Sequence, residues 1–92
     1  MSDKLIELRD TINACDAELF QLLVKRMGIA KEVAAHKTEI GKAVFDELRE
    51  VALLEKIAGW AKEEGYSEEM TKDVWNSIMT LSRNIQEEEM KK

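Results

Sequence analysis

The sequence predicts an all-α fold, with one long and two shorter helices per chain, packed with a second copy into a homodimeric helical bundle. The 92 residues include no proline and only four glycines, a composition typical of helices rather than of sheets and turns. Apolar residues recur every seven positions through the first third of the chain. Capping residues and glycines then delimit two further helical segments.

The first helix is predicted over residues 3–39. Two neighbouring stripes keep a seven-residue spacing along it: Leu5, Ile12, Leu19, Arg26 and Val33, and beside them Leu8, Cys15, Leu22, Ile29 and His36. A heptad sustained over this length is typical of a helix that presents a seam to another helix. A connection follows, in which Gly41 can absorb a turn.

Two shorter helices complete the chain. Asp46 is placed to cap or open the second helix, which Gly65 ends, and Ser67 with the two glutamates after it is typical of the start of a third. The expected core positions are Val51, Leu54, Ile57, Ala58 and Ala61 on the second helix and Met70, Val74, Ile78, Leu81 and Ile85 on the third.

The unequal lengths of these helices predict a dimer. The first helix would be ~54 Å long at ~1.5 Å per residue, and the other two about half as long. A lone chain would therefore leave part of the seam in water, whereas two long helices from two chains can cover each other. We expect one domain over residues 1–92.

Composition and charge exclude several classes of partner. The net charge of -5 predicts repulsion from nucleic acid and from anionic membranes. No apolar run approaches the length of a membrane span, and the first residues lack the apolar core of a signal peptide. The single cysteine fits a reducing compartment. These features together predict a cytoplasmic protein.

Arg26 is the one charged residue on an otherwise apolar stripe. Lys37 lies 11 residues later, at nearly the same azimuth and ~16 Å away along the axis. Two long cationic side chains in this arrangement could grip one small anion. Arg9 lies ~25 Å before Arg26 on the same helix, so any role for it in such a grip would be in the site of a partner chain.

The shorter helices contribute further candidate site residues. Asp46 and Glu50 share a face of the second helix, with Arg49 beside them, and Ser82 and Gln86 share a flank of the third. Each has a structural alternative as well as a functional one. Asp46 can be a helix cap, and the other four can be solvated polar residues.

Arg26 and Lys37 also have structural alternatives. A polar residue on a heptad seam often sets register or oligomeric state rather than binding a ligand, which applies to Arg26. Lys37 can extend its ammonium group into water from the helix end. Other chemistry has less support, because Cys15 and His36 would lie about 30 Å apart on one helix and cannot share a metal. We expect no metal site.

Four segments that carry these polar residues resemble, in order, the all-helical chorismate mutases of the AroQ type. The resemblance runs from about Leu5 to Gln86. The segment "LRDTINACD" resembles the opening of that family and "LLVKRMGIAKEVAAHK" its long central segment, while "FDELREVALLEKI" and "SRNIQ" resemble the second-helix and last signatures. The matched site positions are Arg9, Arg26, Lys37, Asp46, Arg49, Glu50, Ser82 and Gln86.

The resemblance implies an isomerase that converts chorismate to prephenate by a one-step pericyclic rearrangement, with no covalent enzyme intermediate and no cofactor. It also implies an intertwined homodimer with two equivalent sites, each completed by Arg9 of the partner subunit. On this basis Arg26 and that Arg9 would each bind a substrate carboxylate. Lys37 and Gln86 would donate to the ether oxygen, where negative charge grows as the C–O bond breaks.

The remaining matched positions would hold the substrate ring. Glu50, together with Asp46, would accept a hydrogen bond from the ring hydroxyl, and Ser82 would hold the ring carboxylate. Arg49 would support the site by pairing with the acids and through backbone contacts.

Two other functions remain open on the sequence. An isochorismate pyruvate lyase on the same scaffold would bind nearly the same carboxylates and ether oxygen. A noncatalytic dimerisation module would use Arg26 only to set the register of the bundle.

Overall fold

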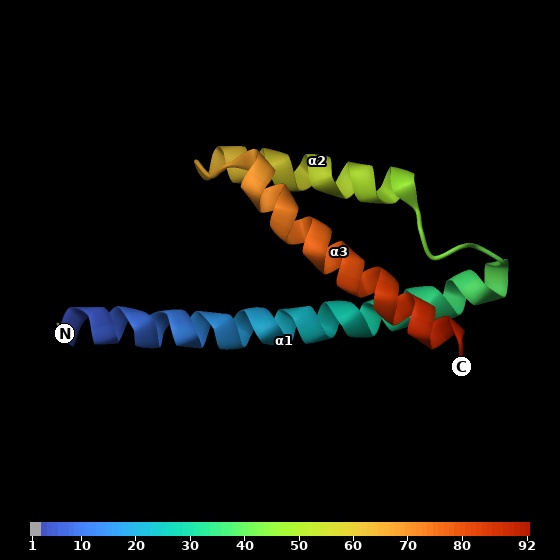
Figure 1. The fold of residues 1–92 in the computed structure, drawn as a ribbon, viewed down its shortest axis with the longest axis horizontal. Coiled ribbons are helices and arrows are strands. Elements are labelled where there is room, and N and C mark those ends of the chain that lie inside the picture. The colour runs from blue at the N-terminus through green and yellow to red at the C-terminus, as the bar shows by residue number, and fades with distance from the viewer. Residues whose placement is uncertain (1–2) are drawn as a thin grey trace.

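The computed structural model describes residues 3–92 and contains three α-helices (Figure 1). Helix α1 (Asp3–Ile40) is the longest, and α2 (Glu47–Glu63) and α3 (Glu68–Met90) follow it. The predicted all-α class, with one long helix followed by two shorter ones, is confirmed. Among the described residues, none of the helices is both long and apolar enough to cross a membrane.

Side-chain caps begin the two shorter helices. Asp46 has an extended backbone, and its Oδ1 accepts a hydrogen bond from the backbone N–H of Arg49 at 3.1 Å. Ser67 does the same at the start of α3, where its Oγ accepts from the N–H of Met70 at 3.1 Å. Each cap satisfies a backbone donor that has no partner within the first helical turn. Both predicted caps are confirmed.

Left-handed glycines follow the first two helices. Gly41 has φ 71° and Gly65 has φ 78°, values that a residue with a Cβ rarely adopts. At the end of α2, Gly65 N–H donates to the carbonyl of Lys62 and Tyr66 N–H to that of Ala61. These two bonds form a Schellman motif. The turn reverses the chain so that α3 runs back toward α1.

Helix α3 holds the chain together. It packs against both α1 and α2, whose backbones make no close approach to each other within residues 3–92. Figure 1 shows α3 crossing diagonally from the far end of α2 to the C-terminal half of α1. The buried apolar side chains are correspondingly few: Met27, Ala30, Ala34, Ile57, Ala61 and Met79.

The face of α3 that is buried within the chain differs from the expected one. Met70 is 71% exposed, Val74 54% and Leu81 39%, so these predicted core positions are largely uncovered. Instead Met79, Ser82 and Gln86 are buried. Helical periodicity was right about the spacing, but it cannot distinguish an apolar face that meets the same chain from one that does not.

The N-terminal half of α1 projects away from the other two helices (Figure 1). The described chain measures 56 × 29 × 14 Å with a radius of gyration of 16.8 Å, whereas a compact domain of this length would have about 12 Å. The predicted seam on this helix is therefore uncovered within one chain. Its exposed large side chains include Leu5, Leu8, Ile12, Leu19 and Leu22.

Candidate active site

A cavity of about 370 Å³ lies where the C-terminal half of α1, the following connection, the first turns of α2 and the C-terminal half of α3 meet. This volume is in the range of small-molecule sites. Its apolar lining is Ile29, Ala30, Val33, Val44, Leu53 and Met79. Its polar lining is Arg26, Lys37, Asp46, Arg49, Glu50, Ser82, Arg83 and Gln86.

Seven of the eight residues predicted from the sequence thus line one cavity. Only Arg9 is absent from that lining. It lies on α1 more than four turns before Arg26, about 25 Å along the axis. The chain itself therefore brings together residues from three helices that are up to 60 positions apart, between Arg26 and Gln86.

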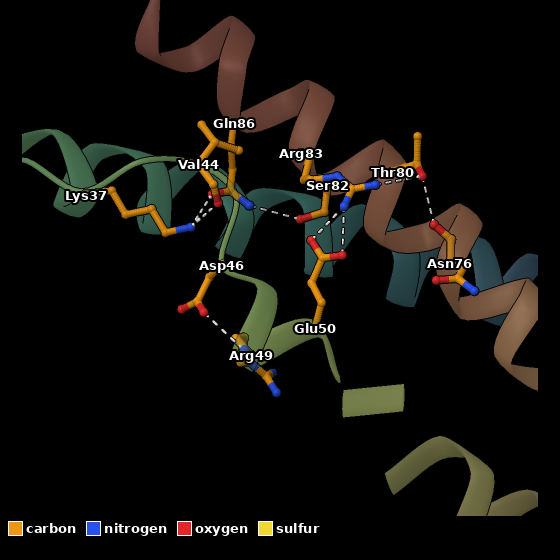
Figure 2. A network of polar contacts seen from close by, with 10 residues as sticks. All are labelled: Lys37, Val44, Asp46, Arg49, Glu50, Asn76, Thr80, Ser82, Arg83 and Gln86. Atoms are coloured by element: carbon orange, nitrogen blue, oxygen red, sulfur yellow. Dashed lines mark hydrogen bonds and ion pairs between the residues drawn. The ribbon is translucent and has the colours of Figure 1, made fainter. Parts of the chain in front are cut away.

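Lys37, Gln86 and Ser82 form a chain of hydrogen bonds across the cavity (Figure 2). Lys37 Nζ donates to the carbonyl oxygen of Val44 at 2.6 Å and to Gln86 Oε1 at 3.1 Å. Gln86 Nε2 in turn donates to Ser82 Oγ at 3.2 Å. Because Gln86 and Ser82 are only 8% and 9% exposed, these bonds offset the cost of burying their polar groups.

The burial of polar groups is fully compensated here. Among the described, non-exposed residues, no buried side-chain nitrogen or oxygen lacks a hydrogen-bond partner. The chain of bonds therefore fixes the orientation of the Lys37 ammonium and of the Gln86 amide. It also ties the end of α1 to α3 and to the connection that contains Val44.

Glu50 is held by an arginine that the sequence analysis did not single out. Arg83 Nη1 contacts both Glu50 carboxylate oxygens, at 2.7 and 3.0 Å. Arg83 Nη2 donates to Thr80 Oγ1 at 3.2 Å, and the guanidinium carbon lies 5.4 Å from the centre of the Phe45 ring. Figure 2 shows the Glu50 and Arg83 side chains pointing toward each other between α2 and α3.

Arg49 does not take the role expected for its side chain. Its backbone N–H donates to Asp46, as described above, but no ion pair joins its guanidinium to an acid in the described range 3–92. The arginine that pairs with a cavity acid is Arg83. Arg49 is on the exposed side of the first turn of α2, whereas Arg83 approaches Glu50 from the facing helix.

A sequence signal for Arg83 was present but weak. Arg83 lies directly after Ser82 and three residues before Gln86, so it borders the same face of α3. Nothing local distinguishes it from an ordinary solvated arginine, because Glu50 is 33 residues away in the sequence. Only the packing of α2 against α3 brings the pair together.

The cavity is positive although the chain is negative. Its lining contains four cationic side chains, Arg26, Lys37, Arg49 and Arg83, and two acidic ones, Asp46 and Glu50, which gives a local net charge of +2. The whole chain carries -5. A cavity of this size and charge is suited to a small anionic ligand.

The cavity lining offers charged and hydrogen-bonding groups to a ligand. No group of three or more His, Cys, Asp or Glu side chains is placed to hold a metal ion in the part of the chain that the structure describes. Cys15 and His36 lie outside the cavity lining.

Comparison with known proteins agrees with these features. The sequence model of the family described as chorismate mutase type II matches residues 8–87. A chorismate mutase of Methanocaldococcus jannaschii is 26% identical over 88 residues, which cover 96% of this chain and 89% of that protein. The T-protein of Haemophilus influenzae is 31% identical over 80 residues, which cover 87% of this chain but only 21% of that longer protein.

The match to the family model spans all three helices and every polar residue that lines the cavity. This chain belongs to the chorismate mutase type II family.

Proposed function

We propose that this chorismate mutase rearranges chorismate to prephenate in two equivalent sites of a homodimer, each built on the cavity between the three helices. The observation that carries the proposal is the convergence of Arg26, Lys37 and Gln86 with four other predicted residues on one small cavity of net charge +2. Chorismate bears two carboxylates, a ring hydroxyl and an ether oxygen. The predicted residues that line the cavity include a side chain that could bind each of these groups of chorismate.

The carboxylates are the groups that arginine recognises best, because its planar guanidinium can donate to both oxygens. Arg26 is half-buried in the cavity lining and would bind one carboxylate. Arg9 of the partner subunit would bind the other. Clamping both ends would hold the enolpyruvyl arm over the ring, which lowers the entropic part of the barrier.

Lys37 and Gln86 are assigned to the ether oxygen. Lys37 has three N–H donors, of which two are engaged, by Val44 and by Gln86. One remains for a ligand, as does the second N–H of the Gln86 amide. Donors held in place before the reaction stabilise the oxygen as its negative charge grows, at no cost of reorganisation.

The ring of the substrate would be oriented by the remaining groups. Glu50, with Asp46 beside it at the start of α2, would accept the hydrogen bond of the ring hydroxyl. Ser82 would hold the ring carboxylate. Arg49, at the exposed rim of the cavity, would contribute positive charge and the backbone N–H that fixes Asp46.

The dimer is supported by the uncovered seam of α1. Within one chain Ile12, Leu19 and Leu22 are 58%, 61% and 63% exposed, and an apolar surface of this length favours association. Pairing of two such helices would also let Arg9 of one chain reach the cavity of the other. A cytoplasmic location stays part of the proposal, supported by the composition.

The test is to follow the ultraviolet absorbance of chorismate with purified protein, without added metal or cofactor, and to identify the product. Prephenate as the product supports the proposal. Salicylate and pyruvate formed from isochorismate would identify a lyase instead. If neither substrate is consumed and Arg26→Leu raises stability, Arg26 serves the register of the bundle.

A further inference from the structure

Arg83 has three neighbours from different parts of the chain. One guanidinium nitrogen contacts Glu50 on α2 and the other contacts Thr80 on its own helix, while the guanidinium carbon lies 5.4 Å from the centre of the Phe45 ring in the connection before α2. Its position is thus determined by three separate neighbours. The side chain is only 32% exposed, so it is held along most of its length.

The contact to Glu50 has a specific geometry. A single nitrogen, Nη1, lies 2.7 Å from one carboxylate oxygen and 3.0 Å from the other. A carboxylate has about four acceptor positions, so this contact leaves others open toward the cavity. The Glu50 side chain is 20% exposed, and Arg83 is the hydrogen-bond and ion-pair partner that the structure gives its carboxylate within residues 3–92.

We propose that Arg83 is a positioning residue, which holds the Glu50 carboxylate at the place where it meets the ring hydroxyl of the substrate. The inference rests on the function proposed above and adds a residue that neither the sequence analysis nor the family resemblance assigned. Arg83 touches Glu50 rather than the reacting atoms. It determines how strictly the cavity requires a hydroxyl at one place on the ring.

A purely structural role is the competing explanation. In that case Arg83 would join α2 to α3 as an ordinary ion pair, and its loss would change stability and leave substrate recognition alone. Partly exposed pairs contribute little to stability. The two roles are separated by measurements that depend on the hydroxyl.

The first experiment is a double-mutant cycle on kcat/KM with Arg83→Met, Glu50→Gln and the double variant. Arg83→Met removes one positive charge from the cavity whether position 50 is Glu or Gln. Only the additional loss of kcat/KM seen when Glu50 is present therefore reports the positioning of Glu50. We expect Arg83→Met to lower kcat/KM about 30-fold when Glu50 is present and about 3-fold when it is replaced, a coupling typical of residues in contact. Equal losses in both backgrounds would overturn the inference.

Arg83→Lys keeps the positive charge and changes only the geometry of the contact with Glu50. This variant keeps the inference testable if Arg83→Met folds poorly. The three N–H donors of lysine share one nitrogen, so lysine cannot reproduce the planar fork with which two guanidinium nitrogens reach Glu50 and Thr80. Two inhibitors serve as probes. The first is a rigid bicyclic dicarboxylate that carries the hydroxyl, and the second is the same compound with a hydrogen atom in place of that hydroxyl. We expect Arg83→Lys to weaken binding of the first about 5-fold and of the second less than about 2-fold, as expected when one buried hydrogen bond is misaligned.

Equal weakening of both inhibitors, or none, would overturn the inference. Lys91→Met is the matched control, since it removes an exposed ion pair of the same helix, with Glu88, outside the cavity lining, and should leave activity and both affinities unchanged. A wild-type protein that does not consume chorismate would contradict the proposed function itself. An active wild type without coupling would contradict only the role of Arg83.

Discussion

Gln86 is the residue that joins the two ends of the hydrogen-bond chain in the cavity. Its oxygen accepts from Lys37 and its nitrogen donates to Ser82, so its amide is oriented by both neighbours. An amide on the apolar side of a helix would destabilise the fold if either group were unpaired. These two bonds fix the orientation of the amide, so its second N–H would meet a ligand in a set direction under the proposed role, which the amide of a solvated glutamine would not.

Replacing Lys37 by alanine tests the electrostatic role of the ammonium group. If its remaining donor stabilises the growing charge on the ether oxygen, we expect kcat to fall ~10²-fold or more. Helix content should change little, because Lys37 is at the last turn of α1. Steady-state kinetics measure kcat, and far-ultraviolet circular dichroism measures helix content. The control is Lys31→Ala, because Lys31 is exposed on the same helix. Unchanged turnover in Lys37→Ala would refute the ether-oxygen assignment.

Replacing Gln86 by glutamate tests the second proposed donor to the ether oxygen of the substrate, because the new side chain can lose its proton. An amide donates at every pH, whereas a carboxyl donates only when it is protonated. At neutral pH the ionised carboxylate of the variant would lie beside the ether oxygen, on which negative charge grows during the reaction. We therefore expect kcat to fall ~10²-fold or more. Activity should rise as the pH falls from 7 toward 5, while the wild type shows no such gain. A variant with a flat pH profile between these values would contradict the role of Gln86 as a donor.

The sequence marked out Arg26 and Lys37, and its resemblance to the family predicted the other five polar residues of the set that line the cavity, but not Arg83. Arg26 is conspicuous because it interrupts an apolar heptad, and Lys37 follows at the same azimuth. Arg83 has no comparable local contrast, and its partner Glu50 is on another helix. Contacts between helices depend on crossing geometry, which side-chain periodicity does not specify. The catalytic roles of these residues remain predictions.

At the scale of elements, the helix boundaries were predictable because each is set by local chemistry. Asp46 and Ser67 cap the helices that they precede, and Gly41 and Gly65 adopt the left-handed backbone that ends a helix. The buried face of α3 was not predictable. This helix turns Met79, Ser82 and Gln86 toward the rest of the chain, whereas its apolar positions Met70, Val74 and Leu81 stay exposed in the described chain. The polar residues of the buried face are not marked by an apolar 3.6-residue period.

Two glycines near the end of α2 should respond to alanine with opposite signs. Gly59 is inside the helix with open space where a Cβ would be added, so Gly59→Ala should stabilise the protein by up to ~1 kcal/mol. Gly65 has φ 78°, and an alanine there should cost ~1–2 kcal/mol. Urea unfolding of both variants at one fixed protein concentration measures the difference. Stabilisation by Gly65→Ala would show that the Schellman turn does not end the helix as described.

At the scale of the whole molecule, the single chain leaves the apolar seam on the N-terminal half of its longest helix uncovered. Its buried apolar residues lie on the faces of α1 and α2 that meet α3 and at Met79 of α3, whereas exposed large apolar side chains occur on all three helices and include a row along the N-terminal half of α1. Burial of apolar surface contributes roughly 25 cal/mol per Å², so a second chain along this seam would supply much of the missing stability. The heptad predicts a partner for this seam, and both the partner and its arrangement are proposals.

Complementation between two defective chains tests the proposed dimer and its shared sites together. In a mixed dimer of Arg9→Ala and Arg26→Ala chains, the cavity with an intact Arg26 would receive an intact Arg9 from the other chain, and the opposite cavity would lack both. Random exchange of equal amounts yields half mixed dimers, so we expect about a quarter of the wild-type activity from chains that are inactive alone.

The matched control mixes Arg26→Ala with Lys37→Ala. Both of these residues line the cavity of their own chain, so every cavity in a mixed dimer would still lack one of them. No exchange of chains can then restore a complete site. Activity regained in both mixtures would point to reversion or contamination, and none in the first mixture would place Arg9 outside the partner's cavity. Recovery in the first mixture alone would require both an intact dimer and a site that two chains build jointly.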